Sequence, residues 1–163
     1  MFLVSDSQQN RHDLIESFLK EDTATIAVIL AAIDFEWTIR RAILALGCSP
    51  TKYIRLEVLG NKNMGSGPDA YKKAWNAEPY RNLRKRIDEV IPHWSRLKDP
   101  ELGALRLRNQ IVHGIRGTVS LPLATDKVQD FLKASKCLEQ LAQENNTSLY
   151  RRITRRKTRK PPC

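Results

Sequence analysis

The sequence lacks the features that stabilise small secreted proteins. It contains three cysteines, Cys48, Cys137 and Cys163, which form no CxxC pair. An odd number of cysteines at such spacings argues against a disulfide framework and against a zinc cluster. The longest uncharged apolar run, residues 23–33, is too short for a bilayer, and Asp6 interrupts the N-terminus before a signal-peptide core can form. We therefore expect a cytoplasmic protein with no metal, no cofactor and no membrane partner.

Strand signals are also scarce. The β-branched residues are scattered among Leu, Ala, Arg, Lys and Glu, and apolar residues recur at helical spacing rather than in alternation. The sequence predicts an all-α, up-and-down bundle of four to five main helices. Its length suits one domain, which we place at residues 1–146, followed by a basic C-terminal tail at 147–163.

The helices are placed by caps and breakers. The second helix is the clearest, with an N-cap at Asp22 or Thr23 and a stop at Gly47. Its predicted inward stripe comprises Ile26, Ile29, Leu30, Ile33, Trp37 and Leu44, widened by Val28, Phe35, Ile39 and Ile43. The other expected helices cover 7–20, 50–59, 69–91 with an interruption at Pro79, 99–113 starting at Asp99-Pro100-Glu101, and 125–144, while 60–68 is expected to be a mobile loop.

Positive charge is abundant. The sequence has 28 Lys and Arg against 18 Asp and Glu, which gives a formal net charge of +10. Such a balance favours polyanionic partners. Much of the excess lies in residues 151–160, and this run fits either a polyanion-binding segment or a solvated arm.

The most informative segment is Leu107-Arg108-Asn109-Gln110-Ile111-Val112-His113-Gly114. A histidine transfers protons near neutral pH and an arginine stabilises phosphoryl oxygens, so the pair suits metal-independent RNA cleavage. On one ideal helix Asn109 and His113 share a face, whereas Arg108 lies roughly 140° away from His113. Either the helix loosens at Gly114, or two copies of the segment meet in a symmetric dimer, which we favour.

Residues 105–114 resemble the signature motif of the HEPN superfamily, and residues 34–44 resemble its early helix. The resemblance implies a HEPN-like bundle of four or five helices, a homodimer that joins two motifs in one cleft, and metal-independent endoribonuclease activity. Arg108 and His113 would be catalytic and Asn109 supporting. Many such proteins are toxins of toxin–antitoxin or phage-defence systems, so an antitoxin protein is an expected partner. One subgroup has a Tyr where this chain has Ile115, and control by tyrosine modification is not expected.

Further candidates for RNA contact are polar residues outside the motif. Glu36 and Arg40 have the i, i+4 order of a surface ion pair. The alternative places Glu36 or Arg41 beside the cleft, orienting His113 or binding phosphate. The predicted helix over 69–91 carries cations near aromatic residues, a composition that suits the binding of single-stranded RNA. More often, such a helix buries its aromatic side chains and exposes its charged ones to solvent. The remaining RNA-binding candidates are Lys72, Lys73, Arg84, Arg116, Arg151, Arg152 and Arg155.

Two other functional hypotheses remain open. One is a non-catalytic HEPN-like module that binds RNA, a nucleotide or a partner protein. The other is a small helical DNA-binding protein whose affinity comes from the basic tail, although the sequence contains no convincing helix-turn-helix.

Overall fold

The computed structural model describes residues 7–60, 68–78 and 85–160. Across these ranges the regular structure is helical and no strand is present, which confirms the all-α class. The described residues form two compact units, each built from segments far apart in the sequence. Unit 1 combines residues up to 36 with 93–136, and unit 2 combines 37–92 with 137–160. The predicted mobile loop falls almost entirely outside the described residues.

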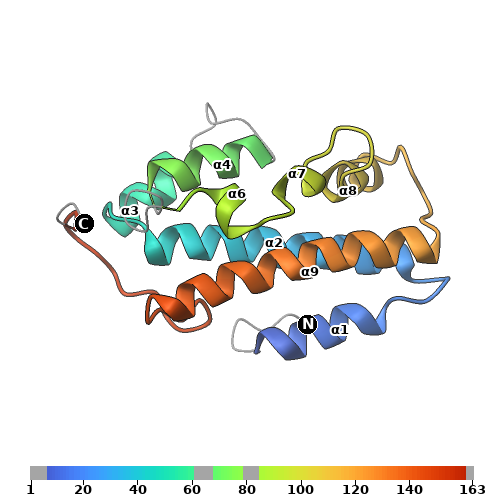
Figure 1. Cartoon of the computed structure of the whole chain (residues 1–163), viewed down its shortest axis with the longest axis horizontal. Coiled ribbons are helices and arrows are strands. Elements are labelled where there is room, and N and C mark those ends of the chain that lie inside the picture. Colours follow the sequence, from blue (N-terminus) through green and yellow to red (C-terminus); the bar gives the residue numbers. More distant parts are fainter. Residues whose placement is uncertain (1–6, 61–67, 79–84, 161–163) are drawn as a thin grey trace. The chain divides into compact units, whose positions relative to one another are not determined.

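Two long helices contribute to both units, and shorter helices belong to one unit each. Figure 1 labels the elements. They are α1 Gln8–Ser17, α2 Ala24–Leu46, α3 Thr51–Tyr53, the π-helix η1 Ile54–Val58, α4 Pro68–Ala77, α6 Ile87–Val90, α7 Trp94–Leu97, α8 Ala104–Val112 and α9 Leu121–Glu144. Among these helices, none combines the length and apolarity that crossing a bilayer would require.

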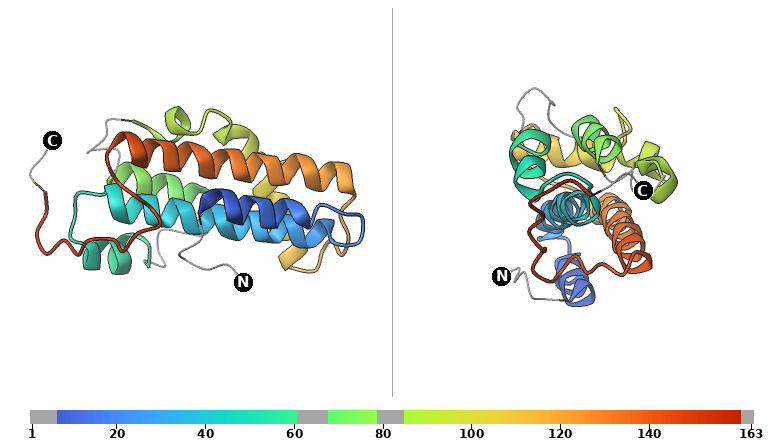
Figure 2. Two further views of the ribbon diagram at one scale, coloured as in Figure 1. Left: turned by 90° about the horizontal axis from the view of Figure 1, so that it is seen from below. Right: turned by 90° about the vertical axis from the view of Figure 1, so that its left-hand side faces the viewer.

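In unit 1, α1 and the first halves of α2 and α9 lie side by side (Figures 1 and 2). The Ser7 hydroxyl caps α1 by accepting a hydrogen bond from the Asn10 N–H at 3.2 Å. Between the long helices, the ring centres of Phe35 and Phe131 are 5.8 Å apart. The ring centre of Trp94, on α7, lies 6.5 Å from that of Phe35. This aromatic cluster forms the centre of unit 1.

A charged cluster is buried between α1 and α2. The Arg11 Nε donates to Asp34 Oδ1 at 2.7 Å, and His12 Nε2 lies 3.3 Å from Asp34 Oδ2. All three side chains are buried. Burial by itself would raise the pKa of Asp34, but the hydrogen bond from His12 and the charge of Arg11 lower that pKa below its ordinary value. Asp34 is therefore ionised in this cluster and carries the negative charge that Arg11 balances.

In unit 2, the end of α2 packs closely against neighbouring segments. A Cβ on Gly47 would lie 2.6 Å from the Ile43 carbonyl oxygen and 2.7 Å from Ile54 Cδ1, so only glycine fits there. The fully buried Trp75 donates its Nε1–H to the Lys85 carbonyl at 3.1 Å. The buried apolar residues of unit 2 include Ile39, Ile43, Ile54, Trp75, Ile87, Ile91, Leu138 and Leu149.

Two predicted helix starts are wrong. The segment at Asp99 is a turn, in which the Asp99 carboxylate accepts the N–H groups of Glu101 and Leu102 at 2.9 and 2.7 Å. The side chain thus satisfies the backbone without a helix, and α8 begins only at Ala104. The last helix begins at Leu121, four residues before the predicted cap at Thr125, because Pro122 is tolerated in a first turn.

The inward face of α2 also differs from the prediction. The core residues are the widening set, with Val28, Phe35, Ile39 and Ile43 fully buried. Two residues of the predicted stripe, Ile26 and Ile33, are 46% and 50% exposed. The helix is apolar on more than one face, so periodicity alone does not decide which face is buried. The buried face includes the small residues Ala27, Ala31 and Ala32, which allow neighbouring helices to pack closely.

The Asp34 cluster generates a stability prediction. Replacing Asp34 by Asn removes the buried carboxylate from Arg11, so we expect a loss of about 3 to 5 kcal/mol in the free energy of unfolding. Because the folded pKa of Asp34 lies below the ordinary 3.8, its contribution is full above that pH and is lost as the pH falls through the folded value. Urea titrations from pH 7 to pH 2 measure both effects.

Asp13→Asn is the matched control, because Asp13 is exposed and bonds only to Gln9. It should change the unfolding free energy by less than about 0.5 kcal/mol. Equal stability of Asp34→Asn and the wild type at pH 7 would contradict a structural role for the cluster.

Candidate functional site

The end of α8 fixes the position of His113. His113 is the C-cap, and Gly114 follows in the left-handed region with φ of +70°. The Gly114 N–H donates to the Ile111 carbonyl at 3.0 Å, and the Ile115 N–H donates to the Gln110 carbonyl at 2.9 Å. These two bonds define a Schellman motif, in which glycine is the favoured left-handed residue. His113 therefore lies at a sharply ended helix terminus.

Arg108 is held by two neighbours in unit 1. Its Nη2 lies 3.1 Å from Glu36 Oε1 on α2, and its Nη1 donates to Asn109 Oδ1 at 2.9 Å. The side chains of Arg108 and Glu36 are 30% and 24% exposed, so solvent reaches the pair. An arginine has more N–H donors than these two bonds use, which leaves donors for a ligand oxygen.

The His113 side chain is exposed and makes no hydrogen bond or ion pair with any described residue. The structure therefore brings Glu36, Arg108 and Asn109 together but does not join His113 to them. Nothing in this part of the chain covers the imidazole. A histidine in this setting is open to a ligand or to a second protein surface.

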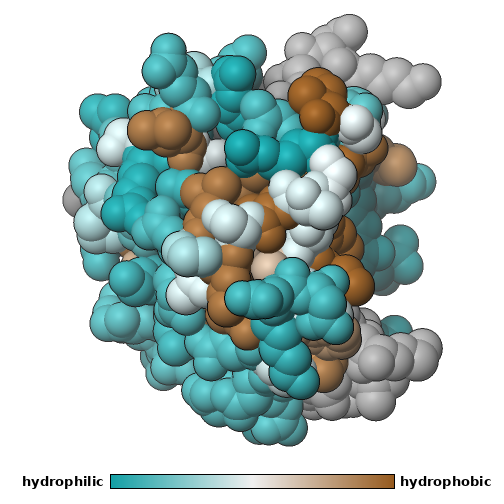
Figure 3. Space-filling view, turned by 90° about the vertical axis from the view of Figure 1, so that its right-hand side faces the viewer, coloured by the Kyte–Doolittle hydropathy of each residue, from teal (hydrophilic) through white to brown (hydrophobic). Residues whose placement is uncertain are grey.

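Large apolar side chains are exposed along α8 and on the segments that flank it. Leu102 and Ile115 are each 75% exposed and Val112 is 55% exposed, in the segments just before, within and after α8. Ile26 and Ile33 of α2 add to the exposed apolar surface of unit 1. Figure 3 shows apolar side chains gathered between hydrophilic ones at the end of the molecule where α8 lies. Such grouping is typical of an interaction surface.

The sequence offers Glu36 two placements, an ion pair with Arg40 or a position beside the motif. Within unit 1, Glu36 pairs with Arg108 of the motif, which agrees with the second placement. Arg40 Nε donates to the Tyr71 hydroxyl at 3.3 Å in unit 2. Arg41 also belongs to unit 2, where it binds the backbone carbonyls of Leu149 and Arg151. Both arginines therefore have partners within unit 2.

The other candidate RNA contacts are dispersed. Lys72 and Lys73 are half-buried and exposed on α4, and Arg116 is exposed in the segment after α8. Arg84 lies outside the described residues. The exposed cations of the C-terminal segment, Arg151, Arg152 and Arg155, all belong to unit 2.

Sequence reasoning missed the partner of His12. The sequence analysis assigns no role to His12, yet its Nε2 lies 3.3 Å from Asp34 Oδ2 of α2. The signal was an isolated carboxylate in an apolar helix, because such a group needs a buried partner. In the described part of the chain, no three His, Cys, Asp or Glu side chains gather as metal ligands do.

Comparison of the chain with family models, with curated proteins and with solved structures finds no match.

The Glu36–Arg108 pair generates a second prediction. Because both side chains are partly exposed, a double-mutant cycle with Glu36→Gln and Arg108→Gln should give a coupling energy below about 1 kcal/mol. The coupling should shrink further at 1 M salt, where exposed charges are screened. Urea denaturation of the four proteins measures it. A coupling above 3 kcal/mol would show that the pair is a structural element rather than an accessible group.

Proposed function

We propose that the protein is a HEPN-like endoribonuclease that cleaves RNA without a metal ion and works as a homodimer. The observation that carries the proposal is that one helix, α8, bears Arg108, which Glu36 and Asn109 hold in place, and ends at an exposed His113. The resemblance of residues 105–114 to the HEPN signature supports the same reading. A role as a toxin, with a protein antitoxin as partner, follows from that resemblance.

The chemistry needs no protein nucleophile. The ribose 2′-hydroxyl attacks the adjacent phosphorus, its proton is removed, and the 5′-oxygen leaves with a proton. His113 supplies one of these proton transfers, as a base toward the 2′-hydroxyl or as an acid toward the leaving oxygen. Arg108 donates hydrogen bonds to the phosphoryl oxygens as their charge develops. Glu36 and Asn109 hold the Arg108 guanidinium in place.

Two subunits supply the cleft in this proposal. Within the described residues of one chain, no hydrogen bond joins the imidazole of His113 to the guanidinium of Arg108. The exposed apolar side chains of α8 and its flanks would be buried in a symmetric dimer, which places two α8 ends together. A second copy of this chain is thus the occupant that we assign to this surface.

Loss of either key residue should abolish cleavage. With single-stranded RNA in EDTA, we expect His113→Ala to lower the rate by roughly 10²- to 10⁴-fold and Arg108→Ala by roughly 10²- to 10³-fold. Denaturing gel electrophoresis of labelled RNA measures the rates. Arg106→Ala is the matched control, because Arg106 is exposed on the same helix and, within the described residues, donates a hydrogen bond to the Pro100 carbonyl alone. Unchanged cleavage in the first two variants would remove the proposal.

Mixing the two inactive variants tests whether the site is shared. If Arg108 of one subunit acts with His113 of the other, half of the dimers in an equal mixture carry one intact pair. Activity should then recover to roughly a quarter of the wild-type rate after subunit exchange. If both groups act within one subunit, the mixture stays inactive. Tagged subunits recovered by pull-down confirm that exchange occurred.

The second candidate function is a non-catalytic HEPN-like binding module. The observation that favours it is the Glu36 carboxylate, which already neutralises Arg108 and would compete with a phosphate group. Glu36→Gln separates the two functions. In a ribonuclease this substitution should change the cleavage rate, whereas a binding module should gain affinity for RNA and show no turnover.

A further inference from the structure

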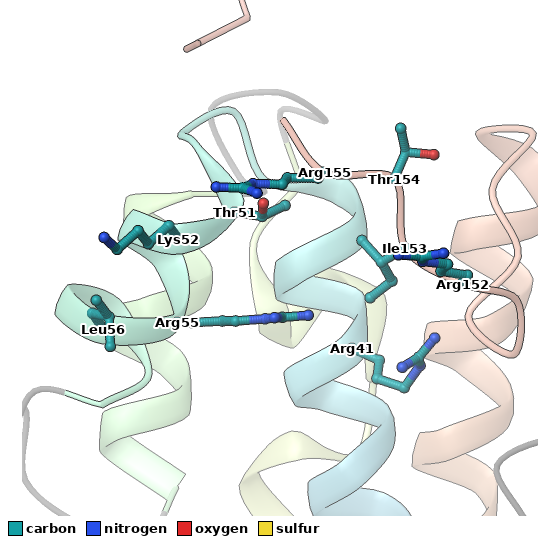
Figure 4. A pocket seen from close by; sticks show the side chains of 9 residues that line it. All are labelled: Arg41, Thr51, Lys52, Arg55, Leu56, Arg152, Ile153, Thr154 and Arg155. Atoms are coloured by element: carbon teal, nitrogen blue, oxygen red, sulfur yellow. The ribbon is translucent and has the colours of Figure 1, made fainter. Parts of the chain in front are cut away.

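Unit 2 contains a pocket with an unusual charge balance. It has a volume of about 800 Å³ and is lined by the end of α2, by α3 and η1, and by the C-terminal segment. Five of the nine lining residues are cations and none is acidic. The lining residues, drawn in Figure 4, are Arg41, Thr51, Lys52, Arg55, Leu56, Arg152, Ile153, Thr154 and Arg155.

The C-terminal wall of the pocket is fixed by Arg156. Its guanidinium donates to the carbonyls of Leu44, Ala45 and Ser49 at 2.6, 3.2 and 3.2 Å, which satisfies acceptors at the end of α2. In return, the Thr51 N–H donates to the Arg156 carbonyl at 3.2 Å. These hydrogen bonds hold the C-terminal end of the segment between Arg151 and Arg156 against the end of α2, and so fix where its backbone runs along the pocket.

The other anchor of this wall is Arg41. Its Nη2 donates to the Arg151 carbonyl at 2.6 Å, and its guanidinium lies 4.9 Å from the centre of the Trp37 ring. Trp37 in turn stacks on Tyr150 with ring centres 5.6 Å apart. Residues on both sides of the pocket's cations are therefore held by hydrogen bonds and ring packing. Ordered cations lose less conformational entropy on binding a ligand.

The cations of the pocket lack negative partners. Lys52, Arg55, Arg152 and Arg155 are exposed and form no ion pair within the described residues. Figure 4 shows Arg55 reaching from η1 toward Arg41. Burial and the positive charge of Arg55 lower the pKa of Arg41 below its ordinary value. Like charges gathered in this way repel one another, and a bound anion relieves the repulsion.

The pocket continues on both sides. One neighbouring pocket of about 400 Å³ shares Lys52, Leu56 and Arg155 with it and adds Tyr53, Lys157 and one acidic residue, Glu57. Another, of about 490 Å³, shares Arg152, Ile153 and Thr154 and adds Arg151 and Lys160. We call the three together the cationic groove. A row of adjoining pockets exceeds the space that one mononucleotide needs and suits an extended polyanion.

Apolar surface accompanies the charge. Tyr53 and Leu56 are 50% and 56% exposed at the groove, where the Tyr53 ring offers a face for base stacking and Leu56 offers an apolar contact. Cations that follow a backbone, with an aromatic ring beside them, are the usual composition of single-strand binding grooves. We propose that the cationic groove of unit 2 binds the phosphodiester backbone of single-stranded nucleic acid without sequence preference. This binding does not require the Arg108 and His113 chemistry.

The test uses full-length protein carrying His113→Ala, so that cleavage cannot obscure binding. Fluorescence anisotropy with a labelled 12-nucleotide oligouridine gives the affinity between 25 and 300 mM salt. Adding Arg55→Ala, Arg152→Ala and Arg155→Ala together should weaken binding at least about tenfold at low salt. The slope of log K against log salt should fall by about 2, since each lost phosphate contact contributes about 0.7. Arg41 and Arg156 are left intact because they hold the segment.

The matched control removes the same charge from unit 1. Lys20→Ala, Lys133→Ala and Lys136→Ala delete three exposed cations that form no ion pair within the described residues. This variant should retain the affinity and the slope of the parent protein. Equal weakening in both triple variants would overturn the proposal, because net charge alone would then explain binding. Thermal unfolding of each variant excludes loss of the fold.

Further arms identify the ligand. Oligodeoxythymidine of equal length distinguishes DNA from RNA as the source of the backbone, and either result supports the proposal. Equal or tighter binding of duplex RNA would contradict a single-strand groove. Pyrophosphate or ATP that displaces the oligonucleotide at equal phosphate concentration would assign the groove to small phosphate compounds instead. Groove-dependent binding of phosphatidylserine vesicles, without binding of the oligonucleotide, would assign it to a membrane surface.

The outcome is separable from that of the proposed ribonuclease. Inactive wild-type protein that still binds through the groove would refute only the cleavage proposal. If the groove variant cleaves RNA at the unchanged rate and also binds the oligonucleotide without loss of affinity, only the proposal that the groove binds nucleic acid is refuted.

Discussion

The charged side chains of the apolar helix α2 each have a partner outside the helix, and these contacts organise both units. Asp34 is buried against Arg11 and His12, and Glu36 pairs with Arg108. Further along, Arg40 bonds to Tyr71 and Arg41 to the backbone of the C-terminal segment. A polar group left unpaired in such a helix would cost free energy. One helix thus draws α1, α8, α4 and the C-terminus into place.

Local signals located much of this fold in the sequence. The bounds of α2 followed from a polar N-terminal flank and from Gly47, and the structure explains the glycine by the close approach of Ile43 and Ile54. The Gly after His113 likewise marked the end of α8. These features depend on residues a few positions apart. They are therefore visible in a linear pattern.

Contacts between residues far apart in the sequence could not be predicted from local patterns. Periodicity showed that α2 is apolar around most of its surface, but it did not show that the alanine face would be covered and Ile33 exposed. The contact between Glu36 and Arg108 could not be read from spacing, because the i, i+4 rule identifies only neighbours on the same helix such as Arg40. The anchoring role of Arg156 was hidden in a run of similar cations whose members differ only in tertiary contacts.

The two proposed activities use opposite electrostatic arrangements. In unit 1 the cation Arg108 is oriented by a carboxylate and an amide, which suits a defined position toward one phosphate. In unit 2 several cations line one pocket without an acid, which suits a strand of many phosphates. A positioned arginine stabilises charge that develops on one phosphate during a reaction, whereas several cations together raise the affinity for a phosphate backbone. The central claim concerns the first arrangement, an imidazole and a guanidinium that act on one phosphodiester.

The chemical nature of the RNA ends tests that claim most directly. Mass spectrometry of the fragments produced in EDTA should find 2′,3′-cyclic phosphates on the upstream pieces and 5′-hydroxyls on the downstream pieces, because the 2′-oxygen is the nucleophile. Fragments that carry 3′-hydroxyl and 5′-phosphate ends would show attack by water instead. That result would contradict the mechanism assigned to Arg108 and His113.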